Sequence, residues 1–132
     1  MKTMQYFAPA IGWGIFIFII STIPGKDIPE IPSLWNLIKT DKLVHMSVYG
    51  VLSWLILRGW FKTHENQTRW HYVKFSVLIA LCCSLLGLFL EWFQEHYCQD
   101  RMFELLDALA NTIGAFGGAM GYFIFKRFRQ TI

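Results

Sequence analysis

Four apolar stretches, each about as long as a bilayer is thick, constrain this chain more than any other feature. They cover residues 6–24, 43–61, 72–93 and 105–125. A helix needs about 20 mostly apolar residues to cross the hydrocarbon core, and lipid offers no partner for an unpaired peptide group. The sequence therefore predicts an all-α membrane protein, a single domain over residues 1–132 built as a bundle of four transmembrane helices.

The composition supports this class and excludes others. Hydrophobic residues make up 55% of the 132 residues and charged residues only 16%, too few for the surface of a soluble domain. The net charge of +3 is not gathered in one basic stripe, so no nucleic-acid partner is expected. Lys2 is the only charged residue before the first stretch, and no small-x-small cleavage site occurs before Ser21, so we interpret that stretch as a retained helix rather than a signal peptide.

The charges between the stretches predict an orientation. Residues 58–74 contain four Lys or Arg residues against Glu65 alone, and residues 126–129 add three more. The loops before the second and fourth stretches are charge-balanced or acidic. Because Lys and Arg accumulate on the cytoplasmic side, we expect both termini and the middle loop to be cytoplasmic.

The connection after the first stretch contains several prolines. Pro24 and Gly25 are expected to close the first helix, and Pro24 to Pro32 to form a stiff extended segment. Residues 33–39 are expected to form a short interfacial helix that opens at Ser33.

Polar side chains gather at the predicted outer end of every stretch. In the second stretch Asp41, His45 and Tyr49 are four residues apart and share one helix face. The outer ends of the third and fourth stretches carry Glu91 with Gln94 and Asp107 with Asn111 in the same way. An ionisable group in lipid costs about 2.5–3.5 kcal/mol, so such groups usually face the bundle interior and pair.

This pattern predicts a polar pocket that opens outward. Its base is expected to contain His45, Glu91, Asp107 and Asn111, with Arg101 at its rim.

The fourth stretch also carries small residues at helical spacing, which let helix backbones approach closely. We interpret this face as packing within the bundle, with a helix–helix partner as the alternative; it consists of Gly114, Gly117, Gly118 and Gly121.

Four segments of the chain form a recognisable series: STIPG (21–25), DKLVHMSVYGVL (41–52), GLFLEWFQ (87–94) and RMFELLDALANTIGAFGG (101–118). Together, and in this order, they resemble the VanZ-like family of small membrane proteins. The resemblance implies a VanZ-like domain in the plasma (inner) membrane of a bacterium, a role near the cell envelope, and a contribution to resistance to lipophilic glycopeptides such as teicoplanin. It supplies no reaction. Carried over by position, the ligand-binding candidates are Asp41, Lys42, His45, Tyr49, Glu91, Gln94, Arg101, Asp107 and Asn111.

Three functions fit these residues. The first is a pocket that binds an anionic lipid or a lipid-linked cell-envelope precursor. The second is a membrane enzyme acting on a lipid phosphate or headgroup, with His45 and Glu91 as the acid/base pair and Asp107 as a further catalytic candidate. The third is a structural or accessory subunit in which the polar groups only hold the helices together.

Two of the candidate residues also have two possible roles each. Arg101 either pairs with Asp107 or recognises a phosphate, and Lys42 either extends to the membrane interface or contacts a phosphate. No cofactor is expected. No metal is expected either, because His45, Glu91 and Asp107 lack the local spacing of known His/carboxylate sites.

Overall fold

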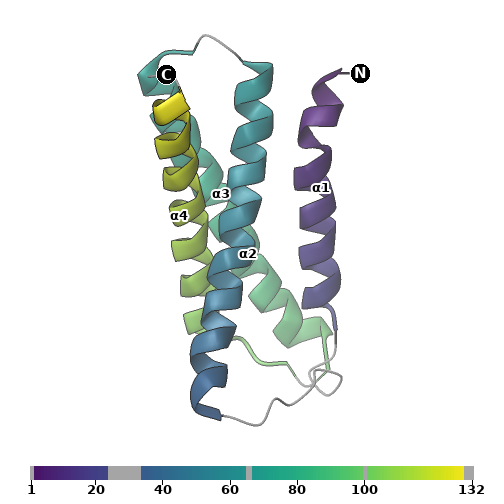
Figure 1. Ribbon diagram of the computed structural model, residues 1–132. Coiled ribbons are helices and arrows are strands. Elements are labelled where there is room, and N and C mark those ends of the chain that lie inside the picture. Colours follow the sequence, from purple (N-terminus) through teal and green to yellow (C-terminus); the bar gives the residue numbers. More distant parts are fainter. Residues whose placement is uncertain (1, 24–33, 65–66, 100, 130–132) are drawn as a thin grey trace.

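The computed structural model describes residues 2–23, 34–64, 67–99 and 101–129, and these form four helices. The helices are α1 (Lys2–Ser21), α2 (Leu34–Thr63), α3 (Arg69–Tyr97) and α4 (Leu105–Arg129). Figure 1 shows both chain termini at one end of the bundle, which we call the terminal end. We call the opposite end, where α1 and α3 finish and α2 and α4 begin, the distal end.

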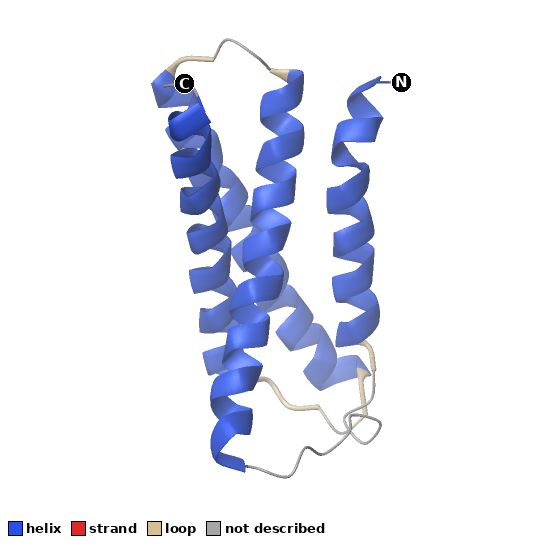
Figure 2. Cartoon of the chain, in the orientation of Figure 1, coloured by secondary structure: helices blue, strands red, loops and turns tan. Residues whose placement is uncertain are grey.

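The predicted all-α fold with four helices is confirmed, since the described residues contain helices and loops (Figure 2). Three helices are long and apolar enough to cross a membrane, over Met4–Ser21, Arg69–Tyr97 and Leu105–Phe128. Large apolar side chains such as Leu81, Leu85 and Phe89 are exposed on the outside of the bundle, as a lipid environment requires. The chain is therefore an integral, multi-pass membrane protein.

The remaining helix, α2, is longer than the other three but more polar. It carries Asp41, Lys42 and His45 near one end and Arg58 and Lys62 near the other. α2 packs against each of the other three helices, most extensively against α4. This central position explains how it can be the least apolar helix of a membrane bundle, since its polar side chains meet protein as well as lipid.

One predicted helix boundary is wrong, and another lies at the edge of the described residues. α1 ends at Ser21, where the Thr22 hydroxyl donates to the Ile19 carbonyl in the closing turn. Pro24 and Gly25, which are expected to close this helix, and the expected extended segment to Pro32 lie outside the described residues. The expected short helix after Ser33 is not separate, because α2 is continuous from Leu34 to Thr63. No proline or glycine interrupts residues 34–49, so the first turns continue into the same helix.

The closest helix contact is between α2 and α4, and glycine makes it possible. A Cβ atom on Gly114 would overlap the backbone of Met46, and one on Gly118 would overlap the carbonyl of Gly50. The Ser53 hydroxyl donates to the Ala115 carbonyl across the same contact at 2.8 Å. Part of the small-residue face of α4 therefore packs within the bundle, as interpreted from the sequence.

The other helix contacts are fewer. The Trp13 indole donates to the Val48 carbonyl at 2.9 Å, which joins α1 to α2. α3 runs obliquely behind α2 and brings its last turns to the end of α1 (Figure 1), where the Gln94 amide donates to the Ser21 carbonyl at 3.0 Å. Elsewhere α1 scarcely contacts α3.

We predict that Gly118→Ala destabilises the bundle, whereas Gly117→Ala does not. The new methyl at 118 meets backbone, which cannot move aside, and overpacking of this kind costs about 1–3 kcal/mol. A Cβ on Gly117 has nothing within 4 Å, and alanine favours a helix by roughly 0.5–1 kcal/mol over glycine. Unfolding of both variants in mixed micelles measures the difference; equal stabilities would contradict the described α2–α4 contact.

Candidate functional site

All four helices contribute to a cavity of about 130 Å³ at the distal end, which we call the distal cavity. Seven of the nine binding residues predicted from the sequence line it: Asp41, His45, Tyr49, Glu91, Gln94, Arg101 and Asn111. The rest of the wall consists of Ser21 and the apolar residues Ile17, Ile20, Val44, Val48 and Leu90. Lys42 and Asp107, the other two predicted residues, pair with each other beside it.

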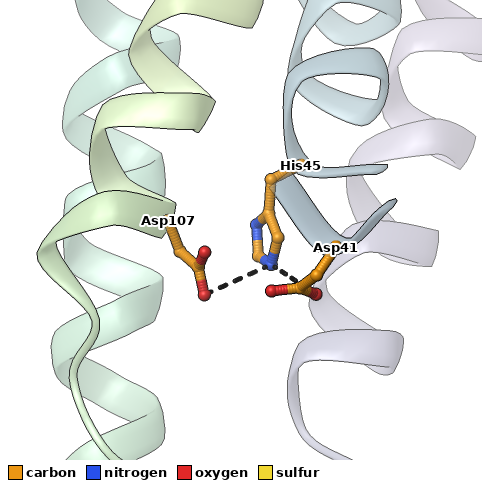
Figure 3. Close-up of side chains that lie close together, drawn as sticks. All are labelled: Asp41, His45 and Asp107. Carbon is orange, nitrogen blue, oxygen red and sulfur yellow. Dashed lines mark ion pairs between the residues drawn. The ribbon is translucent and has the colours of Figure 1, made fainter. Parts of the chain in front are cut away.

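His45 is held from both sides of its ring. Nδ1 lies 3.0 Å from Asn111 Oδ1 on α4. Nε2 lies 3.8 Å from Asp41 Oδ1, one turn earlier on α2, and 3.7 Å from Asp107 Oδ2 on α4. Figure 3 shows the ring between these two carboxylates. The carboxylates beside His45 are thus Asp41 and Asp107, whereas Glu91 lies across the cavity on α3.

Lys42 is the positive charge that Asp107 contacts. Its ammonium contacts Asp107 Oδ1 and Glu104 Oε2, the latter at 2.9 Å, and Asp41 Oδ2 at 3.3 Å. Lys42 precedes the predicted span 43–61. Burial lowers the pKa of the Lys42 ammonium, but hydrogen bonds and attraction from Asp107 and Glu104 outweigh this and raise the pKa above its ordinary value. Lys42 therefore stays charged at neutral pH.

Arg101 does not pair with Asp107, which was one of its two predicted roles. Its Nε donates to the Ile23 carbonyl at 3.4 Å, at the end of α1, while its side chain lines the cavity. Asp107 is instead occupied by Lys42 and faces His45.

The α3 side of the cavity is deeply buried. Glu91 is 4% exposed, and its carboxylate is close to the backbone N–H of Glu104, just before α4. Tyr49 is 3% exposed, and its hydroxyl makes no hydrogen bond with any described residue although the side chain lines the cavity. Glu91 and Tyr49 therefore leave hydrogen-bonding capacity directed at the cavity.

Sequence reasoning missed Glu104. It lies just before α4, accepts backbone hydrogen bonds from Asp107 and Ala108, and also binds Lys42. Its position directly before the fourth apolar stretch, where the first backbone groups of a helix need partners, could have drawn attention to it.

Three residues at this end could hold a metal cation. Ligand atoms of Asp41, His45 and Asp107 lie within 4.8 Å of one another. The trio considered from the sequence contained Glu91 in place of Asp41. The Lys42 ammonium already contacts both aspartates and supplies a positive charge there.

The chain matches a known protein family over most of its length. The family model described as VanZ/LLP1 matches residues 4–127. The chain belongs to the VanZ/LLP1 family. The match covers all four helices, so the resemblance seen in short segments extends over the whole fold. No curated protein and no solved structure matches the chain.

We predict that Lys42 and Asp107 are energetically coupled. In a double-mutant cycle with Lys42→Met and Asp107→Asn, the coupling is expected to be about 0.5–3 kcal/mol, the range for side chains in direct contact. A parallel cycle of Lys42→Met with Glu95→Gln is the control, since Glu95 pairs with His96 instead and should couple by less than about 0.5 kcal/mol. Unfolding in micelles measures both cycles, and equal coupling energies would refute the pair.

Proposed function

We propose that the distal cavity binds the headgroup of an anionic membrane lipid or lipid-linked cell-envelope precursor. The observation that carries this proposal is the arrangement of the wall, which is polar where Asp41, His45 and Glu91 lie and apolar where Ile17 and Ile20 lie. An amphiphile has the same division between headgroup and chain.

The charged residues of the cavity wall limit the kinds of headgroup that the cavity could bind. Arg101 is the cation suited to a phosphate, because its planar guanidinium forms two parallel hydrogen bonds. Asp41 and Glu91 would repel a bare phosphate but accept hydrogen bonds from hydroxyl or amino groups. A headgroup that combines one phosphate with hydroxyl groups, such as a phosphoglycerol or a phosphosugar, satisfies both kinds of residue. Tyr49 adds a hydroxyl that can donate or accept.

The membrane arrangement is part of this proposal. α2 spans the membrane together with the other three helices, the terminal end faces the cytoplasm, and the distal cavity opens outward. The supporting observation is the charge distribution, since the exposed cations Arg58, Lys62, Arg69 and Lys74 all belong to the terminal end.

One observation favours an enzyme as the second candidate. His45 is fixed through Nδ1 by Asn111 while Nε2 faces two carboxylates, which resembles the way an acid/base histidine is oriented. Its partners would be Asp41 and Asp107, with Glu91 reaching the substrate from the opposite wall.

We predict that Arg101→Gln and Glu91→Gln each weaken retention of phosphatidylglycerol by purified protein. The loss is expected to be at least about tenfold for Arg101→Gln, because a hydrogen bond to a charged group contributes about 1.5–3 kcal/mol. Native mass spectrometry with phosphatidylglycerol and phosphatidylcholine measures it. Glu95→Gln is the matched control, since Glu95 is an exposed acid on the same helix end and does not line the cavity.

Unchanged retention in the Arg101 and Glu91 variants, with the fold intact, would leave a purely structural role for the cluster. Consumption of a phospholipid by the native protein that His45→Gln abolishes would instead favour the enzyme.

We also predict that cells producing the native protein tolerate more teicoplanin than cells producing Glu91→Gln at equal membrane levels. A buried carboxylate in the ligand cavity is expected to be needed for the ligand but not for insertion. Growth across a teicoplanin series measures this, with Glu95→Gln as the control. Equal tolerance in cells with and without the native protein would remove the resistance role.

A further inference from the structure

A second cavity lies at the terminal end, between the start of α3 and the last turns of α4. Its volume is about 170 Å³, and we call it the terminal cavity. Its lining residues are Gln67, Arg69, Tyr72, Phe123, Lys126 and Arg127. The residues come from three places in the sequence: the loop before α3, the first turn of α3, and the end of α4.

The lining carries three cations and no carboxylate. The described carboxylates, Asp41, Glu91, Glu95, Glu104 and Asp107, all belong to the distal end. Among described residues, neither Arg69 nor Lys126 takes part in an ion pair. Among the described residues the lining is therefore positive, and Arg69 and Lys126 have no carboxylate partner there.

The base of the cavity is rigid. Tyr72 is buried, its ring stacks on Phe61 with centroids 4.1 Å apart, and the Lys126 ammonium lies 6.0 Å from the ring centroid. Thr68 caps α3 by accepting from the His71 backbone N–H, so the positive end of the α3 dipole points toward the same region. These contacts place the Lys126 ammonium over the aromatic base of the cavity and the start of α3 beside it.

We propose that the terminal cavity binds a phosphate group, with Arg69, Lys126 and Arg127 as its positive partners. The phosphate belongs either to a phospholipid headgroup or to a free anion. The location favours the first source, because the cavity lies at the end of two helices long enough to span the membrane, at the depth where lipid headgroups lie. This site is separate from the distal cavity and does not depend on the function proposed for it.

The test compares one cation in the lining with one outside it. Lys126→Gln is expected to weaken binding of phosphatidylglycerol about tenfold, since it removes a charged donor from the site. Lys74→Gln removes the same charge from an exposed position on α3 outside the lining, and less than a twofold change is expected. Lys126→Arg keeps the charge and should retain binding, which separates loss of a ligand contact from loss of folding.

Binding is measured in Arg101→Gln protein, so that lipid at the distal cavity contributes less, with phosphatidylglycerol, phosphatidylcholine and inorganic phosphate as separate probes. Preference for phosphatidylglycerol that depends on Lys126 supports a lipid headgroup. Binding of inorganic phosphate with the same dependence, and no lipid preference, supports a free anion. Equal losses in Lys126→Gln and Lys74→Gln, or no binding of either anion, would overturn the site while leaving the proposal for the distal cavity untouched.

Discussion

The close approach of α2 and α4 is the contact on which the rest of the structure depends. Gly114 and Gly118 let backbone meet backbone, so the two helices lie nearer than side chains would allow. At that separation Lys42 reaches Asp107, and one turn further along His45 reaches Asn111. The glycine contact and the polar contacts are successive turns of one interface, and a change in the first would displace the second.

The packing of the helices also determines where charged side chains can lie. A carboxylate or ammonium inside lipid is tolerated when it meets a partner or an aqueous cavity. At the distal end, three carboxylates surround Lys42, and Glu91 faces the cavity. At the terminal end, cations lie over tyrosine rings, as Lys62 does over Tyr6 and Lys126 over Tyr72. Among the described residues, the two ends thus have opposite local charge.

Much of this could be predicted from the sequence, because it depends on periodicity. The helices, the shared face of Asp41, His45 and Tyr49, and the packing of Gly114 all follow from spacings within one segment. The partner of Asp107 could not be predicted, because it depends on how α4 is rotated against α2. Residue spacing places Arg101 near Asp107, but the helix contact brings Lys42 there instead. The continuous α2 could not be predicted, because the apolar stretch that indicates a span begins only at Leu43, whereas the helix already includes the more polar turns from Leu34.

α1 has a different relation to the site from the other helices. It supplies Ile17, Ile20 and Ser21 to the wall of the distal cavity, yet it packs mainly on α2 through contacts such as Trp13 with Val48. Its hydrogen bond to α3 in this region runs from Gln94 to a backbone carbonyl, which any residue at position 21 would provide. Ile17 of this wall is nevertheless buried, and it packs in one core cluster with Tyr49 of α2, Cys83 of α3 and Ala115 of α4. α1 therefore closes the apolar side of the cavity through core packing at Ile17, and Gln94 adds a polar contact at the end of the helix while also lining the cavity.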